Sequence, residues 1–167
     1  MFKIRLDYKK YQNAITGNNL IQSEVVWLFE NMNKDKKKTD EIDWKQNLTE
    51  NQYIILRKQG TEPAFTSNLN DEKKEGNYYC AGCNTKLFSS KMKFDSGTGW
   101  PSFYKSYPGA FKTSTDYKLV YPRTEYHCAS CEGHHGHLFE DGPEPTGKRF
   151  CNNGIALKFI EEEVKDE

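Results

Sequence analysis

Four of the five cysteines form two Cys-x-x-Cys pairs, a spacing that turns two sulfur atoms toward one point. The pairs are Cys80 with Cys83 and Cys128 with Cys131, and residues 84–127 separate them. Two such pairs supply the four sulfur ligands that Zn²⁺ favours in tetrahedral sites. Two thioredoxin-like redox pairs and an iron–sulfur cluster are the alternatives. We favour zinc because neither pair opens a helix after a strand.

The ligand set predicts a structural metal rather than a catalytic one. Four thiolates fill the coordination shell and leave no position for a substrate. The sequence around the first pair, YYCAGCNTKLF at 78–88, resembles YHCASCEGHHGHLF at 126–139. We therefore expect two similar hairpins that face each other across the metal.

The fifth cysteine, Cys151, lies apart from the pairs in the segment KRFCNN. On a strand, Arg149, Cys151 and Asn153 would share one face, because alternate residues do. An arginine beside a thiol favours the nucleophilic thiolate, and Asn153 adds a donor and an acceptor. The same face would continue into the core with Ile155, Leu157 and Phe159. The alternative is a buried cysteine that acts as a small hydrophobe.

All four histidines of the chain lie within residues 127–137. His134, His135 and His137 follow the second cysteine pair directly, so the metal would fix their segment. A cysteine nucleophile needs a proton donor, and histidine suits this task near neutral pH. For His127 we expect a structural role. The alternative for the other three is a second metal site, although no carboxylate pattern in the sequence completes one.

A glycine-rich segment, FDSGTGWPSF at 94–103, is predicted to form a tight loop. Trp100 and Phe103 lie on this loop. An aromatic side chain exposed on a rigid loop makes a wall for a small apolar group. The alternative for Trp100 is a place in the core.

Helices and short strands are expected to position these groups. Residues 48–60 form a predicted helix, which Thr49 and Gln52 begin as a capping box and Gly60 ends. Leu48 and Tyr53 can pack together at its start. From residue 76 onward, short aromatic and β-branched runs between turn residues predict antiparallel strands. A 14% aromatic share predicts a core of aromatic rings.

The sequence as a whole predicts one domain with extensions. Its 167 residues contain 24 Lys and Arg and 24 Asp and Glu, a balance that argues against a dedicated nucleic-acid binder. We expect an extension over residues 1–40 with an amphipathic helix near 20–32, a domain over 41–162 and an acidic tail over 163–167. No apolar run is long enough for a membrane span, and the first residues lack a secretory pattern. We expect a cytoplasmic monomer, with reduced thiols.

Together the motifs resemble B-type methionine sulfoxide reductases, which reduce the R epimer of methionine sulfoxide. The resemblance covers residues 43–160 and includes LTENQYIILRKQGTEPAF at 48–65, FDSGTGWPSF, and HCASCEGHHGHLFEDGPEPTGKRFC at 127–151. It implies a mainly β fold of two antiparallel sheets, tent-like, with short N-terminal helices. It also implies one structural zinc per chain on Cys80, Cys83, Cys128 and Cys131.

The resemblance also implies the roles of the site residues. The Cys151 thiolate attacks the sulfoxide sulfur and becomes a sulfenic acid, while His137 protonates the departing oxygen. Trp100 receives the S-methyl group. The matched residues are Cys151, His137, His134 and Asn153 as catalytic and Trp100 and Arg149 as substrate-binding. Phe103, which lies on the same loop as Trp100, is also expected to bind substrate.

This sequence departs from the family at three places. His135 stands where the family usually has an apolar residue. After Cys151 the commoner order is an aliphatic residue, Asn and Ser, whereas Asn152, Asn153 and Gly154 stand here. Thr98 occupies the place of a resolving cysteine that many members carry. An external thiol, such as thioredoxin or glutaredoxin with glutathione, is therefore expected to reset the enzyme.

The resemblance implies an enzyme that repairs oxidised methionine in proteins or peptides. Two other classes are kept as alternatives. A zinc-ribbon interaction module would need the four paired cysteines but not Cys151. A sensor of oxidants would need Cys151 but not Trp100.

Overall fold

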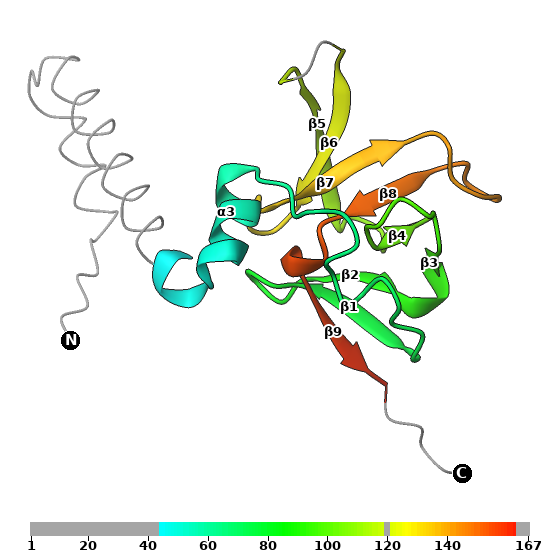
Figure 1. Cartoon of the computed structure of the whole chain (residues 1–167), viewed down its shortest axis with the longest axis horizontal. Coiled ribbons are helices and arrows are strands. Elements are labelled where there is room, and N and C mark those ends of the chain that lie inside the picture. Colours follow the sequence, from blue (N-terminus) through cyan, green and yellow to red (C-terminus); the bar gives the residue numbers. More distant parts are fainter. Residues whose placement is uncertain (1–43, 119–120, 163–167) are drawn as a thin grey trace, which may run out of the picture. The chain divides into compact units, whose positions relative to one another are not determined.

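The computed structural model describes residues 44–118 and 121–162. The helix expected near residues 20–32 and the acidic tail at 163–167 lie outside these ranges. Within the described ranges the chain is mainly β, as predicted (Figure 1). No helix there is both long and apolar enough to cross a membrane.

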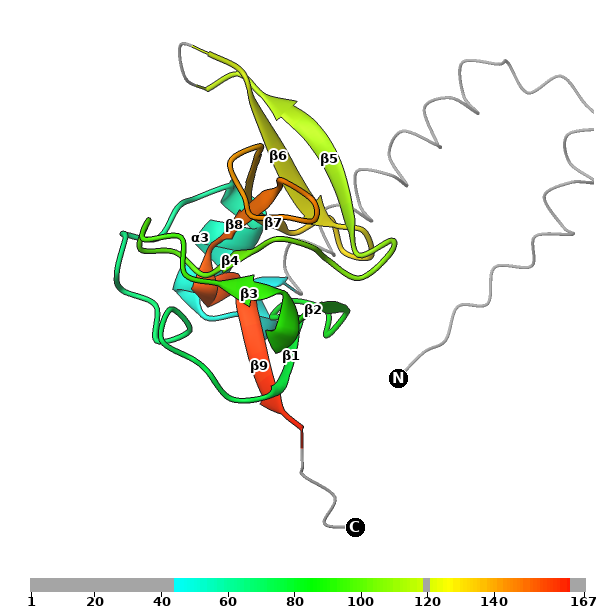
Figure 2. The same ribbon diagram turned by 90° about the vertical axis from the view of Figure 1, so that its right-hand side faces the viewer.

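Two antiparallel sheets make up the fold. The smaller has the strand order β2-β1-β9, and the larger has the order β3-β4-β8-β7-β6-β5. In chain order the strands are β1 (Gly76–Cys80), β2 (Lys86–Ser89), β3 (Lys93–Phe94), β4 (Ser102–Phe103), β5 (Phe111–Asp116), β6 (Arg123–Cys128), β7 (His134–Phe139), β8 (Arg149–Asn152) and β9 (Leu157–Glu161). Figure 2 shows the β5–β6 hairpin extending beyond the other strands of the larger sheet. A 3₁₀ turn, η1 (Ser90–Met92), links β2 to β3.

The helix α3 (Glu50–Lys58) begins as predicted and ends differently. Thr49 and Gln52 form the capping box, with the Gln52 N–H donating to Thr49 Oγ1 at 3.3 Å. The left-handed residue at the C-terminal end is Gln59, with φ 53°, and not Gly60. A side chain on Gly60 would crowd this end of the helix, because its Cβ would lie 2.8 Å from Ile54 Cγ2.

Aromatic rings fill the core between the sheets, as expected. Phe88 and Phe103 stack with centroids 4.0 Å apart, and the edge of Tyr78 meets Phe103 at 4.9 Å. All three side chains are fully buried. Such pairs contribute roughly 0.5–1.5 kcal/mol beyond the area that they bury. The core thus depends on rings more than on aliphatic side chains.

The chain crosses from the larger sheet to the smaller one after Cys151. The 3₁₀ turn η2 (Gly154–Ala156) separates β8 from β9. The expected single strand face from Arg149 to Phe159 is therefore wrong, because its two halves belong to different sheets. The buried Glu62 carboxylate stabilises the crossing by accepting from the backbone N–H groups of Gly154 at 2.5 Å and Ile155 at 3.0 Å.

Candidate functional site

The two Cys-x-x-Cys turns have the same backbone conformation. We call residues 80–85 the first knuckle and residues 128–133 the second. In the first, the Asn84 N–H donates to Cys80 O at 2.9 Å, and in the second, the Glu132 N–H donates to Cys128 O at 2.9 Å. Asn84 and Glu132 are both left-handed, with φ of 58° and 59°. The predicted pair of similar hairpins is confirmed, since β1 and β2 flank the first knuckle and β6 and β7 the second.

The four sulfur atoms of the knuckles meet at one place. Cys80 Sγ lies 3.6 Å from Cys131 Sγ, and Cys83 Sγ lies 3.5 Å from Cys128 Sγ. All four ligand atoms lie within 4.8 Å of one another. A tetrahedron with Zn–S bonds of about 2.3 Å has edges of about 3.8 Å. The cluster can therefore hold a metal ion and is consistent with zinc.

The charge of the cluster also favours a cation. Hydrogen bonding to Cys128 and burial raise the pKa of Cys80 well above its ordinary value and the pKa of Cys131 to about 12. Four thiolates cannot coexist this closely unless a positive ion compensates their charge.

A small pocket of about 110 Å³ lies next to Cys151. His137 on β7 and Cys151 on β8 are directly opposite each other in the strand register, so their side chains share one face. A Cβ on Gly136 would lie 2.0 Å from Cys151 O, so only glycine permits this approach of the two strands. The lining residues are Thr61, Trp100, Arg123, Gly136, His137, Phe139, Cys151 and Asn153.

The structure brings some of the predicted residues into this pocket and leaves others out. Four line it, namely Cys151, His137, Trp100 and Asn153. Phe103 is instead fully buried in the core, stacked on Phe88. His134 and Arg149 lie behind the lining residues, as described below.

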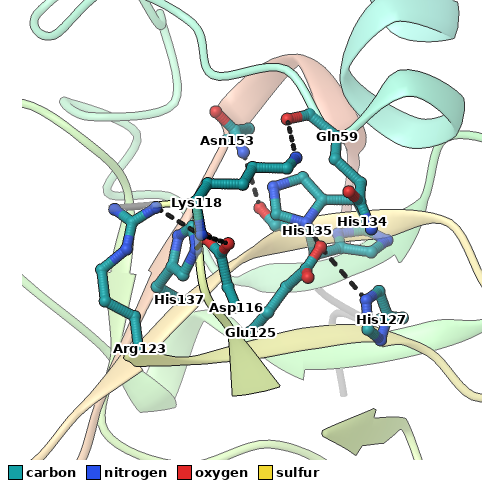
Figure 3. Close-up of polar contacts among 10 residues, drawn as sticks. All are labelled: Gln59, Asp116, Lys118, Arg123, Glu125, His127, His134, His135, His137 and Asn153. Carbon is teal, nitrogen blue, oxygen red and sulfur yellow. Dashed lines mark hydrogen bonds and ion pairs between the residues drawn. The ribbon is translucent and has the colours of Figure 1, made fainter. Parts of the chain in front are cut away.

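His137 is held by a carboxylate that the sequence analysis missed (Figure 3). His137 Nε2 lies 2.8 Å from Asp116 Oδ2, which also accepts from Arg123 Nη2 at 2.7 Å. Hydrogen bonds from the Lys118 N–H, His137 and Arg123 hold the Asp116 pKa well below its usual range. An ionised Asp116 fixes the Nε2–H tautomer of His137, which leaves Nδ1 to exchange a proton.

His134 belongs to a second, more deeply buried group. Its Nδ1 lies 2.5 Å from Glu125 Oε1, which is also 3.1 Å from His127 Nε2 (Figure 3). Burial lowers the pKa of His134 to about 4, although Glu125 opposes this, so the ring is neutral at pH 7. Glu125 lies within ligand distance of His127 and His134, a group that contains only one of the three histidines considered for a second metal site. Glu125 accepts hydrogen bonds in this group, whereas His134 Nε2 is buried without a partner among the described residues.

Cys151 differs from the expectation of a resting thiolate. Burial raises the pKa of its thiol, and Arg149 and a hydrogen bond from Thr98 offset this only in part. The Arg149 guanidinium donates to both carboxylate oxygens of Asp141, at 2.8 and 2.9 Å. Asp141 therefore offsets part of the effect of Arg149, and burial keeps the pKa of Cys151 above its ordinary value.

Trp100 is oriented by Glu62, which had no signal in the sequence. The indole N–H of Trp100 donates to Glu62 O at 3.0 Å. The Glu62 N–H in turn donates to Asn153 Oδ1 at 2.9 Å, and Asn153 Nδ2 donates to His135 O at 2.9 Å. Both ends of the Asn153 amide thus bind backbone, so its visible role is to join the segment of Glu62, which holds Trp100, to β7.

The glycine-rich loop is tight, as predicted. Gly97 and Gly99 adopt positive φ values of 68° and 87°. The Phe65 N–H donates to Gly99 O at 2.7 Å, which fixes the loop beside the segment after α3. Thr98, between the two glycines, reaches the Cys151 thiol.

Comparisons with known proteins agree with this geometry. Residues 48–161 match the SelR domain family. The chain is 49% identical over 132 residues to peptide methionine sulfoxide reductase MsrB of Leptospira interrogans, which covers 78% of this chain and 100% of that protein. It is 47% identical over 133 residues to the MsrB of Methanosarcina mazei, covering 79% and 95%.

A plant relative is longer than the matched region. The chain is 50% identical over 122 residues to the chloroplastic peptide methionine sulfoxide reductase B1 of Oryza sativa subsp. japonica. The match covers 72% of this chain but spans only 56% of that relative's length.

We expect each knuckle cysteine to be needed for metal retention. Cys128→Ser should lower the zinc content below one per chain and lower the melting temperature, because metal binding contributes on the order of 10 kcal/mol that couples to folding. Atomic absorption and thermal unfolding measure both quantities. Cys151→Ser is the control and should keep both. A Cys128→Ser protein with one zinc and an unchanged melting temperature would refute the assignment.

We expect Arg149→Met to raise the Cys151 pKa further, since the partly neutralised cation still favours the thiolate. The midpoint of the Cys151 alkylation rate against pH measures this, with the modified peptide followed by mass spectrometry. Lys148→Met removes an exposed charge one residue away and should leave the midpoint unchanged. A lower midpoint in Arg149→Met would contradict the role given to Arg149.

Proposed function

The chain belongs to the SelR domain family of B-type methionine sulfoxide reductases, and from this we propose that it reduces methionine-R-sulfoxide in oxidised proteins or peptides. The observation that carries the proposal is the meeting of Cys151, His137 and Trp100 in one small pocket. Its volume suits the end of one methionine side chain.

The reaction begins at the resting thiol. As Cys151 sulfur attacks the sulfoxide sulfur, its proton passes to His137, and the ionised Asp116 stabilises the resulting imidazolium. His137 then gives the proton to the sulfoxide oxygen. The bond that the attack formed between the two sulfur atoms then breaks, as the hydroxyl group passes from the substrate sulfur to the Cys151 sulfur. The products are methionine, reduced by two electrons, and a Cys151 sulfenic acid.

The three groups also account for a preference between epimers. The sulfoxide sulfur has three different substituents and a lone pair. Trp100 receives the methyl group, His137 faces the oxygen, and the rest of the side chain must leave through the open mouth. When the sulfoxide sulfur faces Cys151, one epimer places its methyl group, its oxygen and the rest of its side chain in these positions. In the other epimer, the oxygen and one of the carbon substituents would change places.

Two further roles complete the proposal. We assign His134, which is neutral at pH 7, a supporting role next to His137. The two rings make an edge contact, with their centroids 5.7 Å apart. Zinc on the knuckles is structural and takes no part in the redox step. We place the catalytic domain in residues 41–162, and the monomeric protein in the cytoplasm, where an external thiol is available.

Turnover of separated epimers tests the proposal. With a thiol reductant, the wild-type chain should convert R-sulfoxide and leave S-sulfoxide, and Cys151→Ser should convert neither. Trp100→Ala should lower kcat/KM for the R epimer by about tenfold or more, because the methyl group loses its aromatic wall, while Cys151 still reacts with an alkylating agent. Equal rates on both epimers, or unchanged kinetics in Trp100→Ala, would show that the pocket is misassigned.

The sulfenic acid on Cys151 should persist until an external thiol arrives. All five cysteines are free in the structure, and the other four lie in the knuckles. The first external thiol releases water and forms a mixed disulfide, and the second frees Cys151. We expect the wild-type chain, given excess R-sulfoxide without reductant, to form about one methionine per chain and a sulfenic-acid probe adduct.

Thr98 provides the matched variant for this experiment. Because its side chain reaches the Cys151 thiol, Thr98→Cys should form an internal disulfide with Cys151 and lose the probe adduct, with zinc retained. Intact mass and peptide mapping distinguish the two states. An internal disulfide in the wild-type chain, with zinc released, would mean that a knuckle cysteine resolves the sulfenic acid.

A further inference from the structure

His135 is a fully buried histidine that the sulfoxide chemistry does not use. It is the second residue of β7, its relative exposure is 0%, and it stands between His134 and the close-approach glycine Gly136. Its ring packs edge-on against Phe111, with centroids 5.5 Å apart. A buried imidazole without a hydrogen bond costs free energy, so the contacts of its ring nitrogens need an explanation.

The ring faces the cysteine cluster. His135 Nε2 lies 3.4 Å from Cys80 Sγ, a distance suited to an N–H···S hydrogen bond. Cys80 is fully buried, like His135, so water does not compete for this contact. When Cys80 ligates a metal its sulfur is a thiolate, which accepts hydrogen bonds and donates none. The proton of the neutral ring must then be on Nε2.

Each of the other three sulfurs has a polar contact with a near neighbour in its own knuckle. The N–H groups of Ser130 and Cys131 donate to Cys128. Gly133 donates to Cys131, and the Thr85 hydroxyl lies 3.1 Å from Cys83 Sγ. Cys80 receives its donor from a side chain of the opposite knuckle's strand, 55 residues along the chain.

We propose that His135 is a positioning residue of the metal site, donating Nε2–H to the Cys80 thiolate. Four thiolates around one Zn²⁺ carry a net negative charge in a buried place, and a donor aimed at one sulfur stabilises that charge. The bond also limits the movement of Cys80 relative to β7. This inference goes beyond sulfoxide reduction and rests only on metal binding by the four cysteines.

The backbone of His135 extends the effect toward the pocket. Its carbonyl oxygen accepts from both the backbone N–H and the side-chain Nδ2 of Asn153, at 2.8 and 2.9 Å. Asn153 lines the Cys151 pocket. One residue therefore contacts the metal site through its ring and the catalytic pocket through its carbonyl.

Metal release and a spectroscopic signature test the proposal on the full chain. His135→Leu fills the space without a donor and should release zinc to a chelator about tenfold faster or more. Its cobalt-substituted form should show a sulfur-to-metal charge-transfer band at longer wavelength. His135→Gln, whose amide nitrogen can reach the place of Nε2, should restore both readouts toward wild type. His127→Leu, which removes a histidine bonded to Glu125 instead of a sulfur, should leave both unchanged.

A measurement on the wild-type chain covers the case in which His135→Leu does not fold. In the ¹¹³Cd-substituted, ¹⁵N-labelled protein, His135 should be the Nε2–H tautomer and that proton should show scalar coupling to the metal through the sulfur. A ring protonated on Nδ1 alone would overturn the proposal. So would a His135→Leu protein with wild-type zinc release and an unshifted charge-transfer band.

Discussion

The meeting of the two knuckles is the constraint on which the rest of the structure depends. Cys80 ends β1 in the smaller sheet, and Cys128 ends β6 in the larger one, so the four-sulfur cluster ties one sheet to the other. The helix α3 closes over the same place, where Arg57 Nη1 donates to Cys131 O at 2.8 Å. In a domain with few aliphatic residues, a metal on these sulfurs would supply folding energy that a larger apolar core would otherwise provide.

The active pocket is built outward from that junction. The second knuckle leads directly into β7, which fixes His137, and the glycine at 136 lets β8 come close enough to set Cys151 opposite it. The chain then leaves the larger sheet at Asn153. The Glu62 carboxylate stabilises this change of direction by accepting from the N–H groups at the start of η2. Because the carbonyl of Glu62 also holds Trp100, one residue sets both the end of β8 and the aromatic wall. The arrangement of thiol, imidazole and indole therefore follows from backbone pairing more than from side-chain packing.

Local patterns predicted the parts, and the strand register decided how they combine. The capping box, the duplicated knuckle and the tight glycine loop each depend on residues a few positions apart, so the sequence alone was sufficient for them. The Asp116–His137 pair depends on the β5–β6 and β6–β7 registers together, which bring residues 21 positions apart into contact. The same is true of Glu62, 91 positions before Asn153. Phe103 was assigned to the pocket because it follows Trp100 on the loop, but β4 turns its ring into the core, where it stacks on Phe88.

Three carboxylates near Cys151 bind different partners and have different effects. Asp116 keeps its charge and holds His137 at the pocket. Glu125 accepts from a histidine that burial keeps neutral. Asp141 pairs with Arg149 and offsets part of the effect of this cation, while burial is the main cause of the raised Cys151 pKa. A thiolate reacts with peroxides faster than a thiol does, and the sulfenic acid that forms can then be oxidised irreversibly. A cysteine whose pKa is raised by burial is therefore slow to react with free oxidants. The burial of Cys151 and the pairing of Arg149 with Asp141 thus lower the intrinsic reactivity of this thiol and protect it from free oxidants.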